Sequence, residues 1–170
     1  IVIIYGPSGL GKTTLAVGSK NPIVLQTEEG LGILTNNRDI AHFPLAKDYD
    51  TFYGYLKSLV DADKLEFNSL VIDSLDWLEP LIFAKTCEAH KQNSIESFGY
   101  GRGYVEALKY WREVIDLVNR LRNEKKMRIV LIAHNQIKAF HDPSTESYDR
   151  HELKLNKHAS ALCLEASDMC

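Results

Sequence analysis

The stretch that decides the fold is Ile1–Lys20, IVIIYGPSGLGKTTLAVGSK. It begins with a run of apolar, mostly β-branched residues, which is typical of a strand buried on both faces of a parallel sheet. A glycine-rich turn follows, and we expect a helix over residues 12–19. A strand, a glycine turn and a helix in this order place backbone N–H groups and a helix N-terminus where they can bind phosphate.

The turn Gly6–Thr13, GPSGLGKT, matches the pattern G-x-x-x-x-G-K-[ST] at every position. Its glycines allow backbone N–H groups to surround a β-phosphate. Lys12 is predicted to reach the β- and γ-phosphates, and the Thr13 hydroxyl to ligate Mg²⁺. An ordinary strand–helix turn is the alternative. The predicted nucleotide-binding residues are Gly6, Pro7, Ser8, Gly9, Leu10, Gly11, Lys12, Thr13 and Thr14.

The rest of the chain alternates between strand and helix patterns. Alternation of this kind predicts an α/β fold with a mainly parallel sheet and helices on both faces, a three-layer sandwich. Further strands are expected at 22–26, 69–73 and 128–133, with a short one at 153–155, and helices at 49–63, 74–91, 104–125 and 157–166. Glycine-containing or polar loops are expected at 27–39 and 92–103, and a loop or hairpin tip at 141–152.

Length and composition limit the classes of protein to consider. A chain of 170 residues is most simply one domain, residues 1–170, and its net charge of −3 argues against binding nucleic acid through overall charge. Cys87, Cys163 and Cys170 form no CxxC pair, so we expect reduced thiols rather than disulfides or a zinc site. No apolar run approaches the roughly 18 residues of a membrane span. We expect a cytoplasmic protein, and a chain trimmed at one or both ends, because it starts directly on a strand.

Two acidic positions complete the predicted site. Asp73 ends the strand SLVID and is expected to anchor Mg²⁺, although a helix N-cap aspartate would look the same. Ser74 stands where many ATPases carry their catalytic glutamate, directly after this aspartate. Glu28, with Glu29 beside it, follows the strand at 22–26 and is the best remaining base, because ligands sit beyond the carboxyl ends of parallel strands. A solvated loop glutamate is the alternative.

These motifs together resemble the RecA-like P-loop ATPase core over roughly residues 1–140. The matching segments are VLQTEEGLG at 24–32, LVIDSLDWL at 70–78 and VLIAHNQIK at 130–138. The resemblance implies an ATPase that uses ATP and Mg²⁺, with roles for Lys12, Thr13, Asp73 and Glu28. It also implies that Gln136, or alternatively His134, senses the γ-phosphate. Arg102 would then be a candidate arginine finger toward a neighbouring subunit of a homo-oligomer, although an ordinary loop arginine is the simpler interpretation.

A closer resemblance is to the phage-type P-loop proteins of the compact AAA/RecA-like group. It rests on TEEGLG, GYGRGY, LIAHNQIK and LKLNKHASALCLEASD. Some of those proteins take part in single-strand annealing and recombination. The resemblance therefore implies a phage or prophage ATPase acting in DNA recombination, annealing or replication, in the host cell cytoplasm, with a phage recombination or replication protein as a partner.

A basic cluster follows the expected sensor strand. Residues 148–158, YDRHELKLNKH, contain Arg150, Lys154 and Lys157 near an aromatic residue. Phosphate contact and base stacking are the usual means of binding single-stranded DNA, so these three residues are the candidate DNA contacts. A solvated charged face is the alternative, because Asp149 and Glu152 dilute the charge.

Other functions of the phosphate loop remain open. A small-molecule kinase usually carries an arginine-rich lid, which has no counterpart here. A GTPase would need DxxG and [NT]KxD, whereas this chain has DSLD at 73–76 and NKHA at 156–159. A nucleotide-dependent binding module with negligible hydrolysis is the non-enzymatic alternative.

Overall fold

The centre of the molecule is a six-stranded sheet. The computed structural model describes residues 1–30, 40–140 and 148–168. Five strands pair in parallel in the order β1-β5-β4-β2-β3, and β6 pairs antiparallel with β5. The strands are β1 (Val2–Gly6), β2 (Pro22–Gln26), β3 (Ala41–His42), β4 (Ser69–Asp73), β5 (Arg128–Phe140) and β6 (Tyr148–Leu153).

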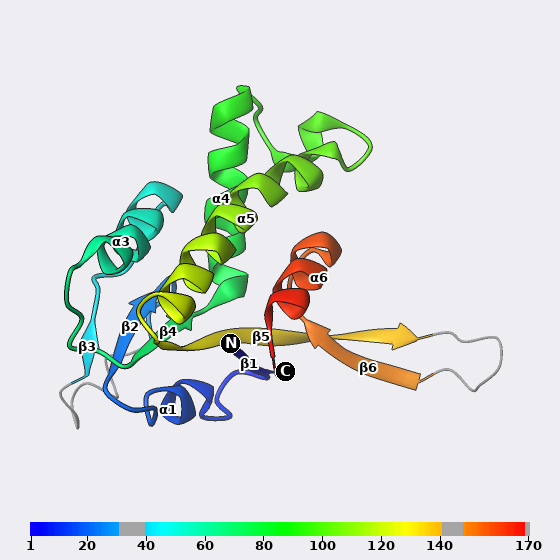
Figure 1. Cartoon of the computed structure of the whole chain (residues 1–170). Helices are drawn as coiled ribbons and strands as arrows, with labels where there is room; N and C mark the ends of the chain where they lie inside the picture. Colours follow the sequence, from blue (N-terminus) through cyan, green and yellow to red (C-terminus); the bar gives the residue numbers. More distant parts are fainter. Residues whose placement is uncertain (31–39, 141–147, 169–170) are drawn as a thin grey trace.

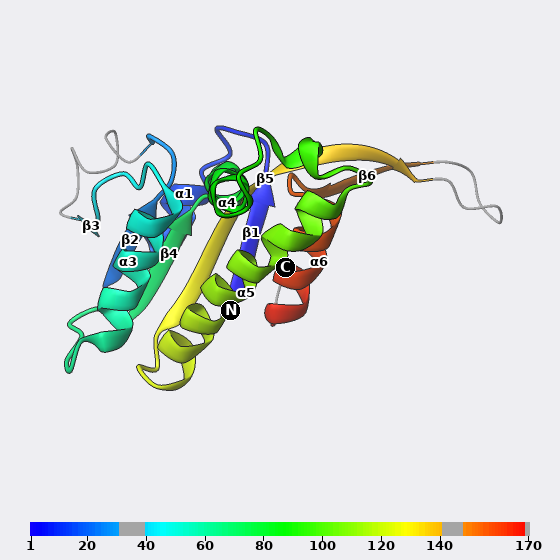
Figure 2. The same ribbon diagram turned by 90° about the horizontal axis from the view of Figure 1, so that it is seen from above.

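Helices cover both faces of this sheet unequally. Figures 1 and 2 show α3, α4, α5 and α6 on one face and the short α1 on the other. The helices are α1 (Lys12–Ala16), α3 (Tyr49–Asp61), α4 (Leu75–His90), α5 (Arg102–Asn123) and α6 (Lys157–Ala166), with a 3-10 turn, η1 (Ile95–Phe98). The expected α/β three-layer arrangement with a mainly parallel sheet is confirmed.

The larger core lies between the sheet and the four helices on one face. α5 presents a continuous apolar stripe, in which Trp111, Val118 and Leu121 are at most 1% exposed, and its charged residues lie on the opposite side. On the other face, Ala16 and Val17 pack against strand residues that include Val71. β4 is buried along its whole length, which explains its uninterrupted apolar sequence before Asp73.

The largest difference from the expected elements is the length of β5. The strand expected to end at Ala133 continues to Phe140 and pairs with β6 as a hairpin that projects beyond the sheet (Figure 2). The apolar pattern ends at Ala133 because this is the last residue of the buried run in β5. Beyond it the backbone satisfies its hydrogen bonds with β6, which does not require apolar side chains.

Smaller differences concern the ends of elements. α1 ends at Ala16 rather than residue 19, and tighter turns follow, in which Gly18 and Ser19 N–H groups donate to Leu15 and Ala16 carbonyls. α4 runs through Pro80, and of the strand expected at 153–155 only Leu153 is in a strand, as the last residue of β6. The 31–39 part of the expected glycine loop, the 141–147 part of the hairpin tip and residues 169–170 lie outside the described residues. Across the described ranges, none of the helices combines the length and apolar character that membrane crossing requires.

Gly103, in the first turn of α5, lets η1 pack closely against this helix. A Cβ at this position would collide with the Ile95 carbonyl oxygen and lie 2.9 Å from Phe98 Cδ2. Gly103→Ala is therefore expected to lower the free energy of unfolding by about 1–3 kcal/mol, measured by denaturant titration. Gly54→Ala is the matched control, because a Cβ there meets no atom within 4 Å and Gly54 lies inside α3. The control should raise stability by up to about 1 kcal/mol; equal effects of the two changes would contradict the packing argument.

Candidate nucleotide site

A cavity of about 350 Å³ lies at the carboxyl ends of the parallel strands. This is the position where α/β sheets bind ligands, because loops from neighbouring strands converge there. The lining residues come from three separate segments of the chain and from the end of the parallel part of β5. They are Ser8, Gly9, Gly11, Lys12, Thr13, Thr14, Glu28, Glu29, Gly30, Asp73 and His134.

The turn between β1 and α1 needs its glycines for backbone reasons. Gly9 and Gly11 have φ angles of 81° and 80°, in the left-handed region that other residues avoid. The Lys12 ammonium group folds back over the turn, where it donates to the Gly6 carbonyl at 3.0 Å and the Pro7 carbonyl at 2.8 Å. Lys12 therefore stands at the cavity with its charge held by neutral carbonyls, available for an anion.

Thr13 and Asp73 meet across the cavity. The Thr13 hydroxyl donates to Asp73 Oδ2 at 2.7 Å, although the two residues lie 60 positions apart. Burial raises the pKa of Asp73, with hydrogen bonding from Thr13 opposing the rise. A buried carboxylate beside a hydroxyl fits Mg²⁺, which prefers oxygen ligands and usually binds through one or two carboxylates plus substrate phosphates. Among the described residues, no group of three or more acidic, histidine or cysteine side chains is arranged to hold a metal ion.

Thr27 brings Glu28 to the same cavity. The Thr27 backbone N–H donates to the Asp73 carbonyl at 2.7 Å. Its buried hydroxyl donates to the Ser74 carbonyl at 2.6 Å and accepts from the Ser74 N–H at 2.8 Å. These bonds join the ends of β2 and β4. Burial, and then the charge of Asp73, raise the pKa of the adjacent Glu28 carboxyl.

A family model described as an AAA domain matches residues 1–170. The chain belongs to this family. A search of curated proteins gave no match. AAA domains are nucleotide-binding ATPases in general, and the cavity beside the phosphate loop is the candidate site for that activity in this chain.

His134 and Gln136 occupy different places in this AAA domain. His134 is in register with Gly6 across β1 and β5 and lines the cavity. The Gln136 amide donates to the Leu153 carbonyl at 2.9 Å and the Leu155 carbonyl at 3.5 Å, at the base of the hairpin. Of the two sensor candidates, His134 is the one that the structure brings to the phosphate loop.

Asp76 is a site residue that sequence reasoning missed. It accepts from the His134 backbone N–H at 2.9 Å and from the Ser74 hydroxyl at 2.9 Å, and its Oδ2 lies 2.9 Å from His134 Nδ1. Burial raises the pKa of Asp76, but the hydrogen bonds from His134 and Ser74 outweigh it, so the pKa lies below its usual value. The signal was present in DSLD, because an acidic residue in the first turn of a helix after a strand end is well placed to accept N–H groups.

Arg102 is not among the residues that line the phosphate-loop cavity. It is the first residue of α5, is exposed, and lines a cavity of about 310 Å³ with His90, Phe98 and Glu106 at the α4–α5 connection. A contact with nucleotide would therefore need another subunit, and this stays a proposal.

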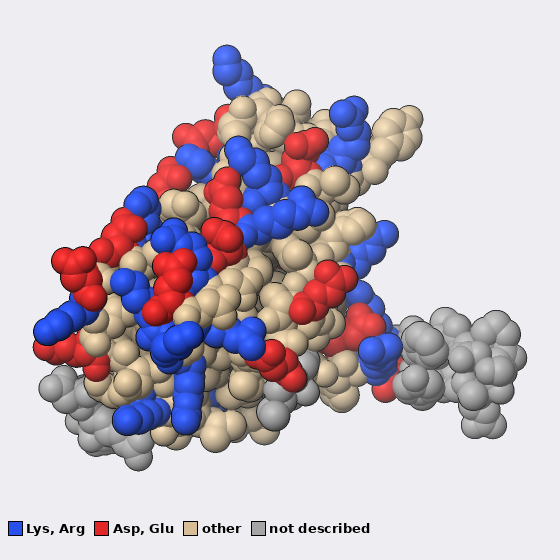
Figure 3. All heavy atoms as spheres, viewed as in Figure 1, with Lys and Arg blue, Asp and Glu red and all other residues tan. Residues whose placement is uncertain are grey.

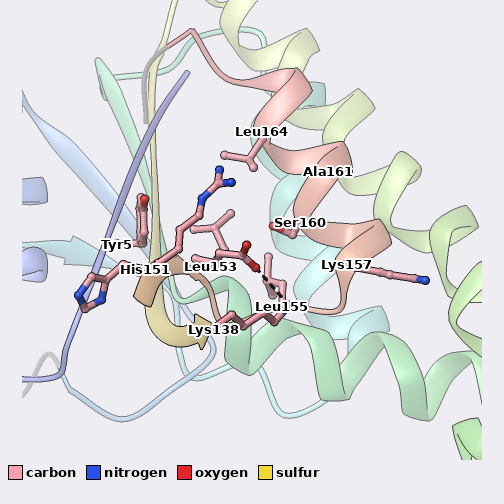
Figure 4. A pocket seen from close by; sticks show the side chains of 11 residues that line it. Tyr5, Lys138, His151, Leu153, Leu155, Lys157, Ser160, Ala161 and Leu164 are labelled. Carbon is pink, nitrogen blue, oxygen red and sulfur yellow. Dashed lines mark ion pairs between the residues drawn. The ribbon is translucent and has the colours of Figure 1, made fainter. Parts of the chain in front are cut away.

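The candidate DNA contacts lie around a second cavity, of about 460 Å³, beside the hairpin. Arg150 and Lys157 line it together with Lys138, and Lys138 pairs with Glu152 at 3.1 Å. Figure 4 shows Tyr5 on one side of this cavity and Ser160, Ala161 and Leu164 of α6 on the other. Lys154 is exposed where the hairpin ends. Figure 3 shows that charges of both signs are mixed over the helical face, so a local cavity is the better DNA candidate than that face.

Glu79, one turn after Asp76 on α4, holds the start of α6. Its two carboxylate oxygens lie 2.9 and 3.1 Å from the Asn156 N–H, which donates to them. Burial raises the pKa of Glu79 to about 7, against the effect of the Asn156 hydrogen bond, and the charge of Asp76 adds to the rise. A carboxyl whose pKa is higher in the folded than in the unfolded state favours folding when it is protonated.

Glu79→Gln tests this charge. The contribution of Glu79 to stability is fully present below pH 4.5, its ordinary pKa, and is lost as pH rises through about 7. The glutamine variant stays neutral and keeps an acceptor, so it should match the original protein near pH 4.5. Above pH 7.5 it should exceed the original protein by on the order of 2 kcal/mol in the free energy of unfolding. Denaturant titrations at both pH values measure this, and a difference that does not change with pH would contradict it.

Proposed function

We propose that the chain binds ATP with Mg²⁺ at the P-loop cavity and hydrolyses it. The observation that carries the proposal is the convergence of Lys12, Thr13, Asp73 and Glu28 on one cavity from three separate segments. The AAA family supports nucleotide binding and ATPase activity in general, and hydrolysis by these particular residues is our inference.

Each residue has a role that follows from its chemistry. Lys12 is a mobile point charge for the β- and γ-phosphates once it leaves its two carbonyl partners. Thr13 and Asp73 supply oxygen ligands for Mg²⁺, which would neutralise charge on the phosphates. Glu28 lines the same cavity, where its carboxylate can accept a proton from the attacking water. Its raised pKa makes it a better base for this step.

Point variants separate binding from hydrolysis. Glu28→Gln should lower the turnover number by about 10²–10⁴-fold while ATP binding persists, because the amide cannot accept the proton. Lys12→Ala should weaken binding itself. Phosphate release measures the turnover number of Glu28→Gln. Fluorescent-nucleotide titration measures the ATP affinity of both variants. Glu29→Gln is the matched control, since Glu29 is exposed and neighbours Glu28. A larger loss in Glu29→Gln than in Glu28→Gln would show that Glu28 is not the base, and phosphate transfer to a metabolite would favour a kinase.

We further propose single-stranded DNA as the partner of the ATPase. The support is the cavity lined by Arg150 and Lys157 beside a projecting hairpin, with Lys154 exposed at its base. The resemblance to phage-type proteins favours a role in recombination, annealing or replication, together with a phage protein and in a homo-oligomer that uses Arg102 between subunits. The host cytoplasm is the matching location.

Salt dependence tests the DNA contacts. Removing one phosphate contact should lower the slope of log K against log salt concentration by about 0.7 for single strands. Arg150→Ala and Lys157→Ala should each do so in fluorescence-anisotropy titrations with an oligonucleotide. Lys64→Ala, an exposed lysine between α3 and β4, should leave the slope unchanged. An equal effect of all three changes would show that charge alone, rather than this cavity, binds DNA.

A further inference from the structure

We propose that Asp76 is the positioning residue for γ-phosphate recognition, because it holds the His134 ring so that Nε2 serves the phosphate cavity. The inference rests on the proposed function, since it concerns how the same site distinguishes ATP from ADP. It assigns a role to a residue that is not among those that line the phosphate cavity.

The position of His134 is set on both sides of its backbone. Its N–H donates to Asp76 Oδ1 at 2.9 Å, and its carbonyl accepts from the Lys154 N–H at 2.9 Å. His134 also stands in register with Gly6, the first residue of the phosphate loop. The residue at which β5 turns from the parallel sheet into the hairpin is therefore held beside the loop, and the remaining freedom is rotation of the side chain.

Asp76 removes that freedom as well. Its Oδ2 lies 2.9 Å from His134 Nδ1, so Nδ1 carries a proton and donates it to the carboxylate. Nε2 is then the ring nitrogen left for the cavity, which His134 lines. The carboxylate is itself held by the Ser74 hydroxyl at 2.9 Å, and it is nearly buried, with a side chain 4% exposed. This arrangement is the one by which a carboxylate usually orients a histidine toward a ligand.

The location of the Asp76–His134 pair indicates which ligand group His134 would contact. The phosphate loop surrounds the β-phosphate, and the cavity continues from the loop to Glu28, Asp73 and His134. Among these, His134 is the group that can donate a hydrogen bond to an anionic oxygen, whereas Glu28 and Asp73 are acceptors. A terminal phosphate in this part of the cavity would meet His134 on one side, and ADP would leave Nε2 without an anion.

The test measures the ratio of ATP affinity to ADP affinity, using fluorescent analogues of both nucleotides with Mg²⁺. In the unchanged chain the ratio should favour ATP, and Asp76→Ala and His134→Ala should each lower it by about tenfold or more, the size of one charge-assisted hydrogen bond. ADP affinity should change little. Asp76→Asn, which retains an acceptor for the His134 N–H, should preserve the unfolding midpoint more closely than Asp76→Ala and still lower the ratio.

Two readouts separate positioning from a structural effect. The imidazole ¹⁵N shifts of His134, identified by comparison with His134→Gln, should show protonation at Nδ1 in the unchanged chain and lose this preference in Asp76→Ala. Glu79→Gln is the matched control, because Glu79 lies on the same side of α4 one turn further and contacts Asn156 instead; it should leave the ratio unchanged.

The outcomes distinguish this inference from the proposed function. ATP hydrolysis with an unchanged affinity ratio in Asp76→Ala and Asp76→Asn would overturn the role of Asp76 and leave the ATPase proposal in place. An equal decrease of the ATP-to-ADP affinity ratio in Glu79→Gln would show a general effect of α4, and it would also overturn the role of Asp76. Failure of the unchanged chain to bind either nucleotide would overturn both proposals.

Discussion

The buried carboxylate of Asp73 is the constraint on which the site depends. It ends the central strand at 5% exposure, and burial raises its pKa, although hydrogen bonding with Thr13 and Glu28 and the charge of Lys12 act in the opposite direction. Burial, and then the charge of Asp73, raise the pKa of the adjacent Glu28 carboxyl. Keeping two adjacent carboxylates ionised at this site costs free energy. A divalent cation bound together with phosphate would lower that cost. The charges at this cavity are therefore those expected of a site that binds a nucleotide together with a divalent cation.

The first two turns of α4 connect this cavity to the rest of the molecule. The helix begins directly after Asp73 and Ser74, and its acids contact both ends of the projecting hairpin. Asp76 holds His134 where β5 leaves the sheet, and Glu79 holds Asn156 where the chain enters α6. Hydrogen bonds from α4 therefore join the end of the strand that carries Asp73 to the base of the hairpin.

Most of the fold was predictable because its signals are local. Strands buried on both faces require uninterrupted apolar runs, and β2 and β4 appear in the structure at the residues predicted for them, as does α6. Element ends were less predictable, as in α1, because the last turn of a helix depends on packing that the local sequence does not encode. The sequence left residues 141–152 open between a loop and a hairpin tip, because the exposed residues there have no apolar alternation to mark a strand.

The sequence by itself determined that a phosphate loop, an aspartate at a strand end and an acidic pair after the second strand exist, because each depends on a short pattern with its own chemistry. Only the tertiary structure decided which of these side chains meet. Strand order brings residues 13, 28, 73 and 134 to one edge, although long stretches of chain separate them. His134 and Gln136 show why the sequence alone could not decide which side chains meet. They differ by two positions on one strand, and the hydrogen bonds of Asp76 and Leu155, which come from other elements, direct one to the cavity and the other to the hairpin.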